Sequence, residues 1–302
     1  MSKSIFVVGS SNTDMVVRTK RIPQKGETIL GGDFFMFPGG KGANQAVAAA
    51  RLGGHVTFVA NLGNDLFGEN ALRQFEQEGI HTGFISHDAV NPSGVALISV
   101  DESGENSIVV ASGANNFLAP AQVEAALENA PPQSIVLIQL ETPIETVAAT
   151  ARMAKQEDLQ LILNPAPAAK LPDEILSAVS VITPNETEAT LLTGISVTDE
   201  RSAAKAADFF HQRKISSVII TMGSQGAYVS SEKFTGIVPV QKTNAVDTTA
   251  AGDCFNGALA VALAEGLEID RAVQFANAAA AISVTRMGAQ ASMPKRNEIN
   301  FQ

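Results

Sequence analysis

The sequence predicts an α/β fold in which a doubly wound, mostly parallel sheet is flanked by helices and carries a small β-lid. Three observations support this fold. Short runs rich in valine and isoleucine recur along the chain, helical stretches lie between them, and two further segments have the pattern of β-hairpins. Strands that alternate with helices indicate a parallel sheet with helices on its faces.

The predicted strands are short apolar runs with the composition of buried strands. They cover residues 5–8, 135–140, 159–163, 179–182 and 216–221. We therefore expect each of them to be covered on both faces.

The predicted helices between these strands end at a glycine, which can adopt the left-handed conformation that terminates a helix. They cover 44–52, 65–78 and 185–193. Two further stretches have an apolar stripe at helical spacing, which we interpret as core packing. The stripes are Ala203, Ala206, Ala207 and Phe210, and Phe255, Ala258, Leu259 and Ala262.

Two segments interrupt the alternation, at 15–30 and 94–110, and both have the pattern of a hairpin. Hairpins inserted in a doubly wound fold often cover its ligand cleft, so we expect β-lid segments at about 15–32 and 94–111. A plain edge hairpin is the alternative. Neither a linker nor an internal repeat is visible, which predicts one domain over residues 1–302.

The composition excludes several classes of function. The chain has 302 residues, 21 Lys and Arg, 31 Asp and Glu, and a formal charge of −10, which argues against nucleic-acid and anionic-membrane partners. It has no apolar run long enough for a membrane span and no signal-peptide pattern at its start. Because Cys254 is the one cysteine, no internal disulfide can form, and we expect a cytoplasmic protein.

A glycine cluster at 38–44 leads directly into the helix predicted from residue 44. Such a turn lets backbone N–H groups approach a ligand closely. It is not a Walker A loop, because Phe35 replaces the first glycine and Gly42 follows Lys41 where serine or threonine is required. The turn after the first strand, 9–12, lacks the glycine pattern of a dinucleotide-binding fold.

A second small-residue cluster, 247–253, leads into a helix predicted at 254–265. Bare N–H groups of Ala250, Ala251 and Gly252 at the positive end of a helix dipole would suit a phosphate or a developing anion. Asp253 lies in the same turn. A helix cap is its ordinary role, but a carboxylate beside an anion hole is also what phosphoryl transfer to an alcohol requires.

Taken together, these segments resemble the ribokinase family of carbohydrate kinases, also called the PfkB type, from Val8 to about Pro294. The two family signatures correspond to 39–44 and 247–253, about 200 residues apart. The similarity extends to 9–14, 139–141, 164–167, 183–188 and 285–290. Ala250 departs from the signature, where many relatives have glycine, but an alanine also leaves its N–H free.

The resemblance implies ATP-dependent phosphorylation of D-ribose at the 5-hydroxyl. Alternatives are a related kinase acting on deoxyribose, a nucleoside or a sugar phosphate, and a catalytically silent sugar-binding regulator. The resemblance makes Asp253 the general base, beside an anion hole of Ala250, Ala251 and Gly252. It assigns sugar binding to Asn12, Asp14, Gly40, Lys41, Asn44, Glu141 and Asp253. From the sequence alone, a structural role is as good an interpretation as sugar binding for two of these residues. Asp14 could be a hairpin-turn residue, and Glu141 could be a helix cap.

The resemblance also implies a site for ATP and Mg²⁺. The nucleotide residues are Asn185, Glu188, Thr221, Gly223, Ser224, Gly226, Gly252 and Asn277. Asn185 and Glu188 would place a hydrated magnesium ion, although acidic residues are common at a helix start for electrostatic reasons alone. For the turn at 221–226, an ordinary β-hairpin turn is the alternative to an ATP-binding loop.

Positions that hold a monovalent cation, K⁺, in the family correspond to Asp247, Thr249, Ser283, Arg286, Gly288 and Ser292. The family also implies a homodimer formed through the β-lid. The basic cluster Arg18, Lys20, Arg21 and Lys25 lies on the predicted lid. We interpret it as a solvated face, with a phosphate clamp as the alternative. Cys254 is expected to pack as a small apolar residue, and the four histidines have no metal-ligand spacing.

Overall fold

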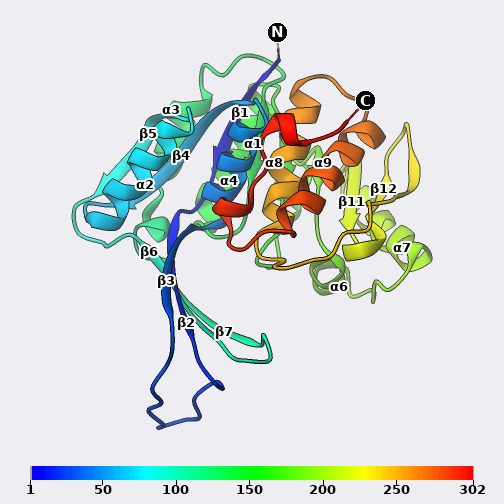
Figure 1. The fold of residues 1–302 in the computed structure, drawn as a ribbon. Coiled ribbons are helices and arrows are strands. Elements are labelled where there is room, and N and C mark those ends of the chain that lie inside the picture. The colour runs from blue at the N-terminus through cyan, green and yellow to red at the C-terminus, as the bar shows by residue number, and fades with distance from the viewer. Residues whose placement is uncertain (1, 302) are drawn as a thin grey trace.

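The computed structural model describes residues 2–301 and contains a large helix-covered sheet with a smaller sheet projecting from its edge (Figure 1). The strands are β1 (Ser4–Val8), β2 (Asn12–Arg18), β3 (Phe34–Gly39), β4 (His55–Gly63), β5 (His81–Asp88), β6 (Gly94–Val100), β7 (Asn106–Ala111), β8 (Ile135–Ile138), β9 (Gln160–Leu163), β10 (Val181–Ile182), β11 (Ser217–Thr221), β12 (Ala227–Ser230) and β13 (Thr235–Val238). The α-helices are α1 (Lys41–Arg51), α2 (Leu66–Gln77), α3 (Pro120–Leu127), α4 (Ile144–Gln156), α5 (Asp173–Leu176), α6 (Glu186–Thr193), α7 (Glu200–His211), α8 (Ala251–Ala264) and α9 (Ile269–Ser283).

The large sheet has the order β13-β12-β11-β10-β9-β8-β1-β4-β5. Strands β11 to β5 in this order are parallel to their neighbours, and β12 and β13 add an antiparallel edge. The predicted mostly parallel sheet is confirmed, and each apolar run forms one of its strands. The run at 135–140 stops being a strand at Ile138, because the polar residues that follow leave the sheet and enter the site described below.

Two apolar cores cover the two faces of this sheet, because successive residues of a strand point to opposite sides. Ile5 and Val7 of β1 pack into one core with α1, α2, α8 and α9. Phe6 and Val8 pack into the other with α3 to α7. Both predicted helical stripes are buried in these cores, and Cys254 is fully buried as expected.

The second sheet has the order β3-β2-β6-β7. The hairpin predicted at 94–110 is confirmed as β6 and β7, which pair antiparallel around the turn at 101–105. The boundaries predicted for the other hairpin are wrong: β2 begins at Asn12, and its antiparallel partner β3 lies at 34–39. Pro23 and Gly26 fall in the non-strand connection between them, where Pro23 lacks the N–H that a strand ladder needs.

The amino termini of α1 and α8 lie together at the carboxyl ends of the parallel strands, the edge where ligands bind in open α/β sheets. Both helices begin three residues before the predicted starts, at Lys41 and Ala251, so the small-residue clusters form their first turns. Gly257 allows this approach, because a Cβ there would lie 2.7 Å from the Ala48 Cβ and from the Gln45 carbonyl oxygen.

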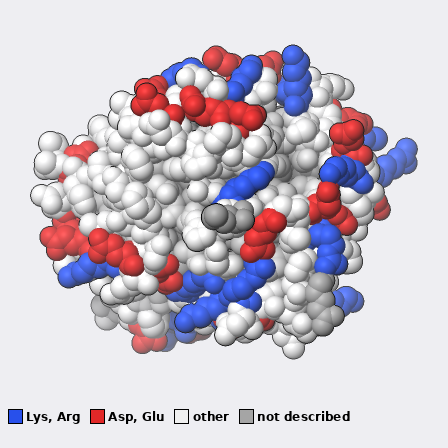
Figure 2. All heavy atoms as spheres, turned by 90° about the horizontal axis from the view of Figure 1, so that it is seen from above, with Lys and Arg blue, Asp and Glu red and all other residues white. Residues whose placement is uncertain are grey.

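The surface carries charged side chains of both signs. On the face seen in Figure 2, acidic and basic side chains are interspersed, without a broad basic patch among the described atoms. Within residues 2–301, no helix combines the length and the apolar character needed to cross a bilayer.

Candidate active site

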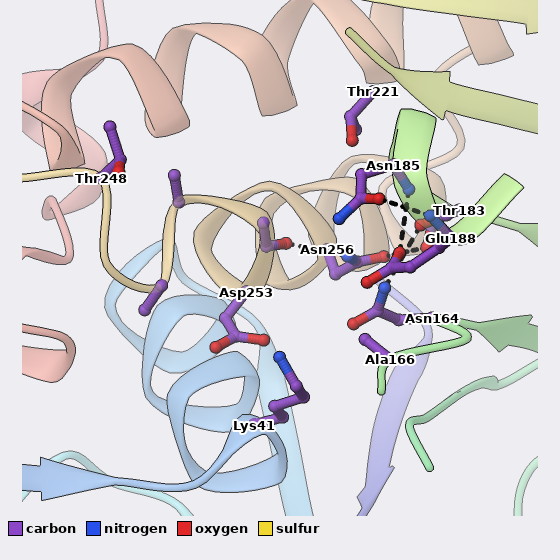
Figure 3. Close-up of a pocket in the computed structure, with 13 residues that line it drawn as sticks. Lys41, Asn164, Ala166, Thr183, Asn185, Glu188, Thr221, Thr248, Asp253 and Asn256 are labelled. Atoms are coloured by element: carbon purple, nitrogen blue, oxygen red, sulfur yellow. Dashed lines mark hydrogen bonds between the residues drawn. The ribbon is translucent and has the colours of Figure 1, made fainter. Parts of the chain in front are cut away.

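The carboxylate of Asp253 lies at the centre of the site, in the first turn of α8 (Figure 3). It is 6% exposed and does not cap its helix, so the interpretation as an ordinary cap is wrong. Its two oxygens instead accept hydrogen bonds from α1: Asn44 Nδ2 donates to Oδ2 and Gln45 Nε2 donates to Oδ1, each at 2.9 Å. Burial raises the pKa of Asp253, against the charge of Lys41 and these two hydrogen bonds, which lower it.

Backbone N–H groups are available beside this carboxylate. The N–H of Ala251 donates to the Thr248 carbonyl at 3.2 Å and is engaged within the turn. Across residues 2–301, the N–H groups of Gly252 and Asp253 have no acceptor. They point out of the positive end of α8, where an anion would be stabilised. Of the three predicted donors, Ala251 is engaged, whereas Ala250 and Gly252 have no acceptor within residues 2–301, and Asp253 adds a free N–H that the sequence did not predict.

Ala250 has a conformation that explains why glycine is common at this position in the family signature. Its φ of 58° places it in the left-handed region, which is unfavourable for a residue with a Cβ by about 1–2 kcal/mol. The Ala250 carbonyl still accepts a hydrogen bond from the Cys254 N–H, as the residue before a helix normally does. The departure strains the turn without blocking it.

A cavity of about 180 Å³ opens in front of these groups. It is lined by Lys41, Asn164, Ala166, Thr183, Asn185, Glu188, Thr221, Thr248, Ala250, Ala251, Gly252, Asp253 and Asn256. Lys41 projects into it from α1, opposite Asp253 (Figure 3). Burial lowers the pKa of Lys41, but Asp253, Glu141 and Glu188 outweigh it and keep the ammonium charged.

A second cavity, of about 220 Å³, lies against β2 and the segment after β8. It is lined by Ser10, Asn12, Val110, Ser112, Asn115, Asn116, Leu140, Glu141, Thr142 and Pro167. Glu141 connects the two cavities, because its carboxylate accepts from Ser10 Oγ at 2.5 Å and from the Lys41 N–H at 3.1 Å. The interpretation of Glu141 as a helix cap is wrong, since Pro143 occupies that position.

The remaining residues predicted to bind sugar lie around the same space. Asp14 lies within β2 and not in a turn; burial first, and then Glu141 and Asp253, raise its pKa to about 6. Gly40 has a φ of 87°, and a Cβ there would lie 2.7 Å from the Asn12 N, so glycine is required. The Oδ1 atom of Asn44 is buried without a hydrogen-bond partner among the described residues. A ligand hydroxyl would satisfy it.

The residues predicted to bind nucleotide divide into two groups. Asn185, Glu188 and Thr221 line the first cavity, together with Gly252. Asn185 and Glu188 also form a capping box at the start of α6, so the structural interpretation of this pair is confirmed. Gly223, Ser224 and Gly226 form the turn between β11 and β12, which confirms the hairpin interpretation. The Asn277 amide is engaged with the Val238 carbonyl. None of these last four lines the cavity.

The residues predicted around a monovalent cation lie behind the first turn of α8. Asp247 joins two segments: its oxygens accept from the N–H groups of Thr249 at 2.9 Å and Gly288 at 2.8 Å. Ser283 and Ser292 hydroxyls donate to nearby backbone carbonyls, and Arg286 pairs with Glu298. Asp247 therefore links the two backbone segments, and the backbone carbonyl, carboxylate and hydroxyl oxygens of these residues are the possible ligands of an ion.

Several polar residues of the site carried no predicted role, and Gln45, Gln139, Asn164 and Asn256 are among them. Gln139 and Asn164 directly follow buried strands β8 and β9, which was the available signal. Asn256 donates to the Gly252 carbonyl and accepts from the Thr183 hydroxyl, so it fixes the turn that carries Asp253. Gln45 directly follows Asn44, the last residue of the glycine cluster.

Comparison with known proteins agrees with this geometry. The profile described as pfkB family carbohydrate kinase matches residues 2–296. The ribokinase of Haemophilus influenzae is 47% identical over 298 residues, 99% of this chain and 97% of that protein. The deoxyribokinase of Salmonella typhimurium is 36% identical over 297 residues, 98% of this chain and 97% of that protein. The structure of Arabidopsis thaliana ribokinase complexed with ribose and ATP has a TM-score of 0.88 at 32% identity, covering 99% of this chain and 98% of that one. The chain therefore belongs to the pfkB family of carbohydrate kinases.

Proposed function

We propose that this chain is a ribokinase, which transfers the γ-phosphoryl group of ATP to the 5-hydroxyl of D-ribose and releases ADP and ribose 5-phosphate. The observation that carries the proposal is the buried Asp253 carboxylate, which lies next to two free N–H groups and faces the sugar-binding set. The names of the matched ribokinases support ribose as the acceptor. The intact base and anion hole argue against a catalytically silent regulator.

The chemistry follows from the positions of these groups. Asp253 takes the proton of the acceptor hydroxyl as the new phosphorus–oxygen bond forms. The N–H groups of Gly252 and Asp253 stabilise the negative charge on the transferred group, and Lys41 adds a positive charge across the cavity. Catalysis of this kind depends on positioning and electrostatics more than on covalent intermediates.

The acceptor is a free sugar and not one that already carries phosphate. Asn12, Asp14, Asn44 and Glu141 are neutral or negative, and Lys41 is the cation among the predicted sugar ligands. Two carboxylates would repel a phosphate, whereas they accept hydrogen bonds from hydroxyls. The basic cluster at the end of β2 and in the connection after it does not offset this, because none of its four residues lines either cavity and Arg21 pairs with Glu27.

The first cavity would hold the phosphate end of ATP together with Mg²⁺. Glu188 offers one carboxylate beside the Asn185 side chain, a sparse oxygen set that suits a magnesium ion keeping most of its water. When bound, the ion would neutralise charge on the phosphates. Gly223, Ser224, Gly226 and Asn277 would contact the nucleotide beyond the cavity.

A K⁺ ion would fit the backbone behind the anion hole. Asp247 holds the 247–249 and 286–288 segments together, so carbonyl oxygens of the two can face one ion without a direct contact to substrate. Potassium would then fix the turn that leads to Gly252.

The second sheet has a feature that supports a homodimer. Met36, Met15, Leu97 and Val109 form one row across its four strands, on the face opposite Asp14 and Val110. Met36, Leu97 and Val109 are more than half exposed. A contiguous apolar row is typical of a protein interface, and a second copy of this chain would cover it.

Sugar specificity is tested by measuring ADP release with ATP, Mg²⁺ and a panel of ribose, 2-deoxyribose, fructose 1-phosphate and fructose 6-phosphate. We expect the highest kcat/KM with ribose, because its hydroxyls match the acceptors above. A higher value with 2-deoxyribose would favour a deoxyribokinase. A preference for either phosphate ester would show that the basic cluster sets specificity, and no sugar-dependent ADP release would refute the enzyme.

Potassium activation is tested by replacing K⁺ with tetramethylammonium at equal ionic strength. We expect the rate with ribose to fall, because the larger cation cannot bind between the two backbone segments. An equal rate in both salts would refute the proposed cation site.

Dimer formation is tested by sedimentation of the wild type and of Leu97→Asp, with Val90→Asp as a control on an exposed loop. The wild type and the control should sediment at twice the mass of the 31.5 kDa chain, and Leu97→Asp as a monomer. A monomeric wild type, or a dimeric Leu97→Asp, would exclude this interface.

A further inference from the structure

A chain of buried amides leads to the proposed catalytic base. Gln139 Nε2 donates to Gln45 Oε1 at 2.6 Å, and Gln45 Nε2 donates to Asp253 Oδ1 at 2.9 Å. The same Gln45 nitrogen donates to Asn164 Oδ1 at 3.0 Å. Gln45 and Gln139 are at most 1% exposed, so water does not compete for these hydrogen bonds.

The chemistry of Asp253 fixes the direction of every bond in this chain. An ionised carboxylate only accepts, so Gln45 must turn its NH₂ group toward Asp253 and its oxygen away. That oxygen then needs a donor, which Gln139 supplies with its own NH₂ group. Reversing either amide would place oxygen against oxygen.

Gln139 adopts this orientation at the expense of its own oxygen. Its Oε1 is buried without a partner among the described residues and lies against Gly9, where any Cβ would overlap it. An unpaired buried acceptor is unfavourable. Gly9 makes room for the unpaired Gln139 oxygen. The orientation of Gln139 is therefore explained by what Asp253 needs, which is a donor from Gln45.

We infer that Gln45 is a positioning residue for Asp253: held by Gln139, it fixes one carboxylate oxygen and stabilises the ionised form that accepts the proton. The inference rests on the proposed function for the role of Asp253. Asn44, which the resemblance implicates in sugar binding, holds the other oxygen, so Gln45 is the side-chain donor to the base that has no predicted role in sugar binding.

Other charged and titratable groups also act on Asp253, and Gln45 must be distinguished from them. Lys41 of α1 favours the ionised carboxylate, whereas Glu141 after β8 opposes it. Asp14 of β2, Glu188 of α6 and the Cys254 thiol of α8 also interact with it electrostatically. Replacing Gln45 leaves all of these groups in place and removes one of two side-chain donors.

The experiment compares wild type with Gln45→Met and Gln139→Met, which keep an unbranched side chain but cannot donate. Thr150→Val is the control, because it removes a buried hydrogen bond within α4, away from the site. The readouts are kcat and KM for ribose as functions of pH, thermal stability, and a ¹³Cγ NMR titration of aspartate-labelled protein, with Asp253→Asn to assign the signal.

For Gln45→Met we expect kcat at pH 7 to fall roughly 10-fold to 100-fold, with a much smaller change in KM for ribose. The acidic limb of kcat and the NMR titration of Asp253 should both move to higher pH, because the ionised form has lost a donor. Gln139→Met should act in the same direction but less strongly. Thr150→Val should change stability alone.

An unchanged pH profile and an unchanged Asp253 titration in Gln45→Met would overturn the inference, whatever happens to stability. The same displacement in Thr150→Val would also overturn it. If the wild type releases no ADP with any sugar, the proposed function fails, and the NMR titration still decides whether Gln45 stabilises the ionised Asp253.

Discussion

The buried negative charge of Asp253 is the constraint on which the rest of the site depends. A carboxylate out of contact with water is strongly unfavourable unless donors and a positive charge surround it. Here the amino terminus of α8, the Asn44 and Gln45 amides and the Lys41 ammonium supply them. Three of these groups belong to α1, so α1 and α8 must pack with their first turns together.

The close packing of α1 and α8 explains why glycine occurs at several positions around the site, more directly than contact with a ligand does. Gly257 lets α8 lie against α1, and Gly42 lets the start of α1 approach the end of β1, where a Cβ would lie 2.6 Å from the Gly9 carbonyl carbon. Gly40 turns the chain from β3 into α1 with a positive φ. Strand β3 thus leads directly into α1, which carries the Asn44 and Gln45 side chains that hold Asp253, so the second sheet is connected to Asp253 through α1.

Much of this arrangement could be predicted from the sequence, because the order of elements and the two small-residue clusters are local patterns. The return strand at 34–39 was missed because its apolar residues precede a glycine run and face solvent on a projecting sheet. The early starts of α1 and α8 were missed because each first turn contains a glycine, Gly42 or Gly252, and glycine is a weak helix former. Gln45 and Gln139 could not be assigned, because their roles exist only where three distant segments meet.

The account's central claim, that Asp253 is the base, is tested most directly by Asp253→Asn, with turnover measured beside equilibrium binding of ribose by calorimetry. The amide keeps the shape but cannot take the proton. We expect kcat to fall by roughly 10²-fold to 10⁴-fold while ribose binding largely survives. Near-normal turnover in the folded variant would contradict the account.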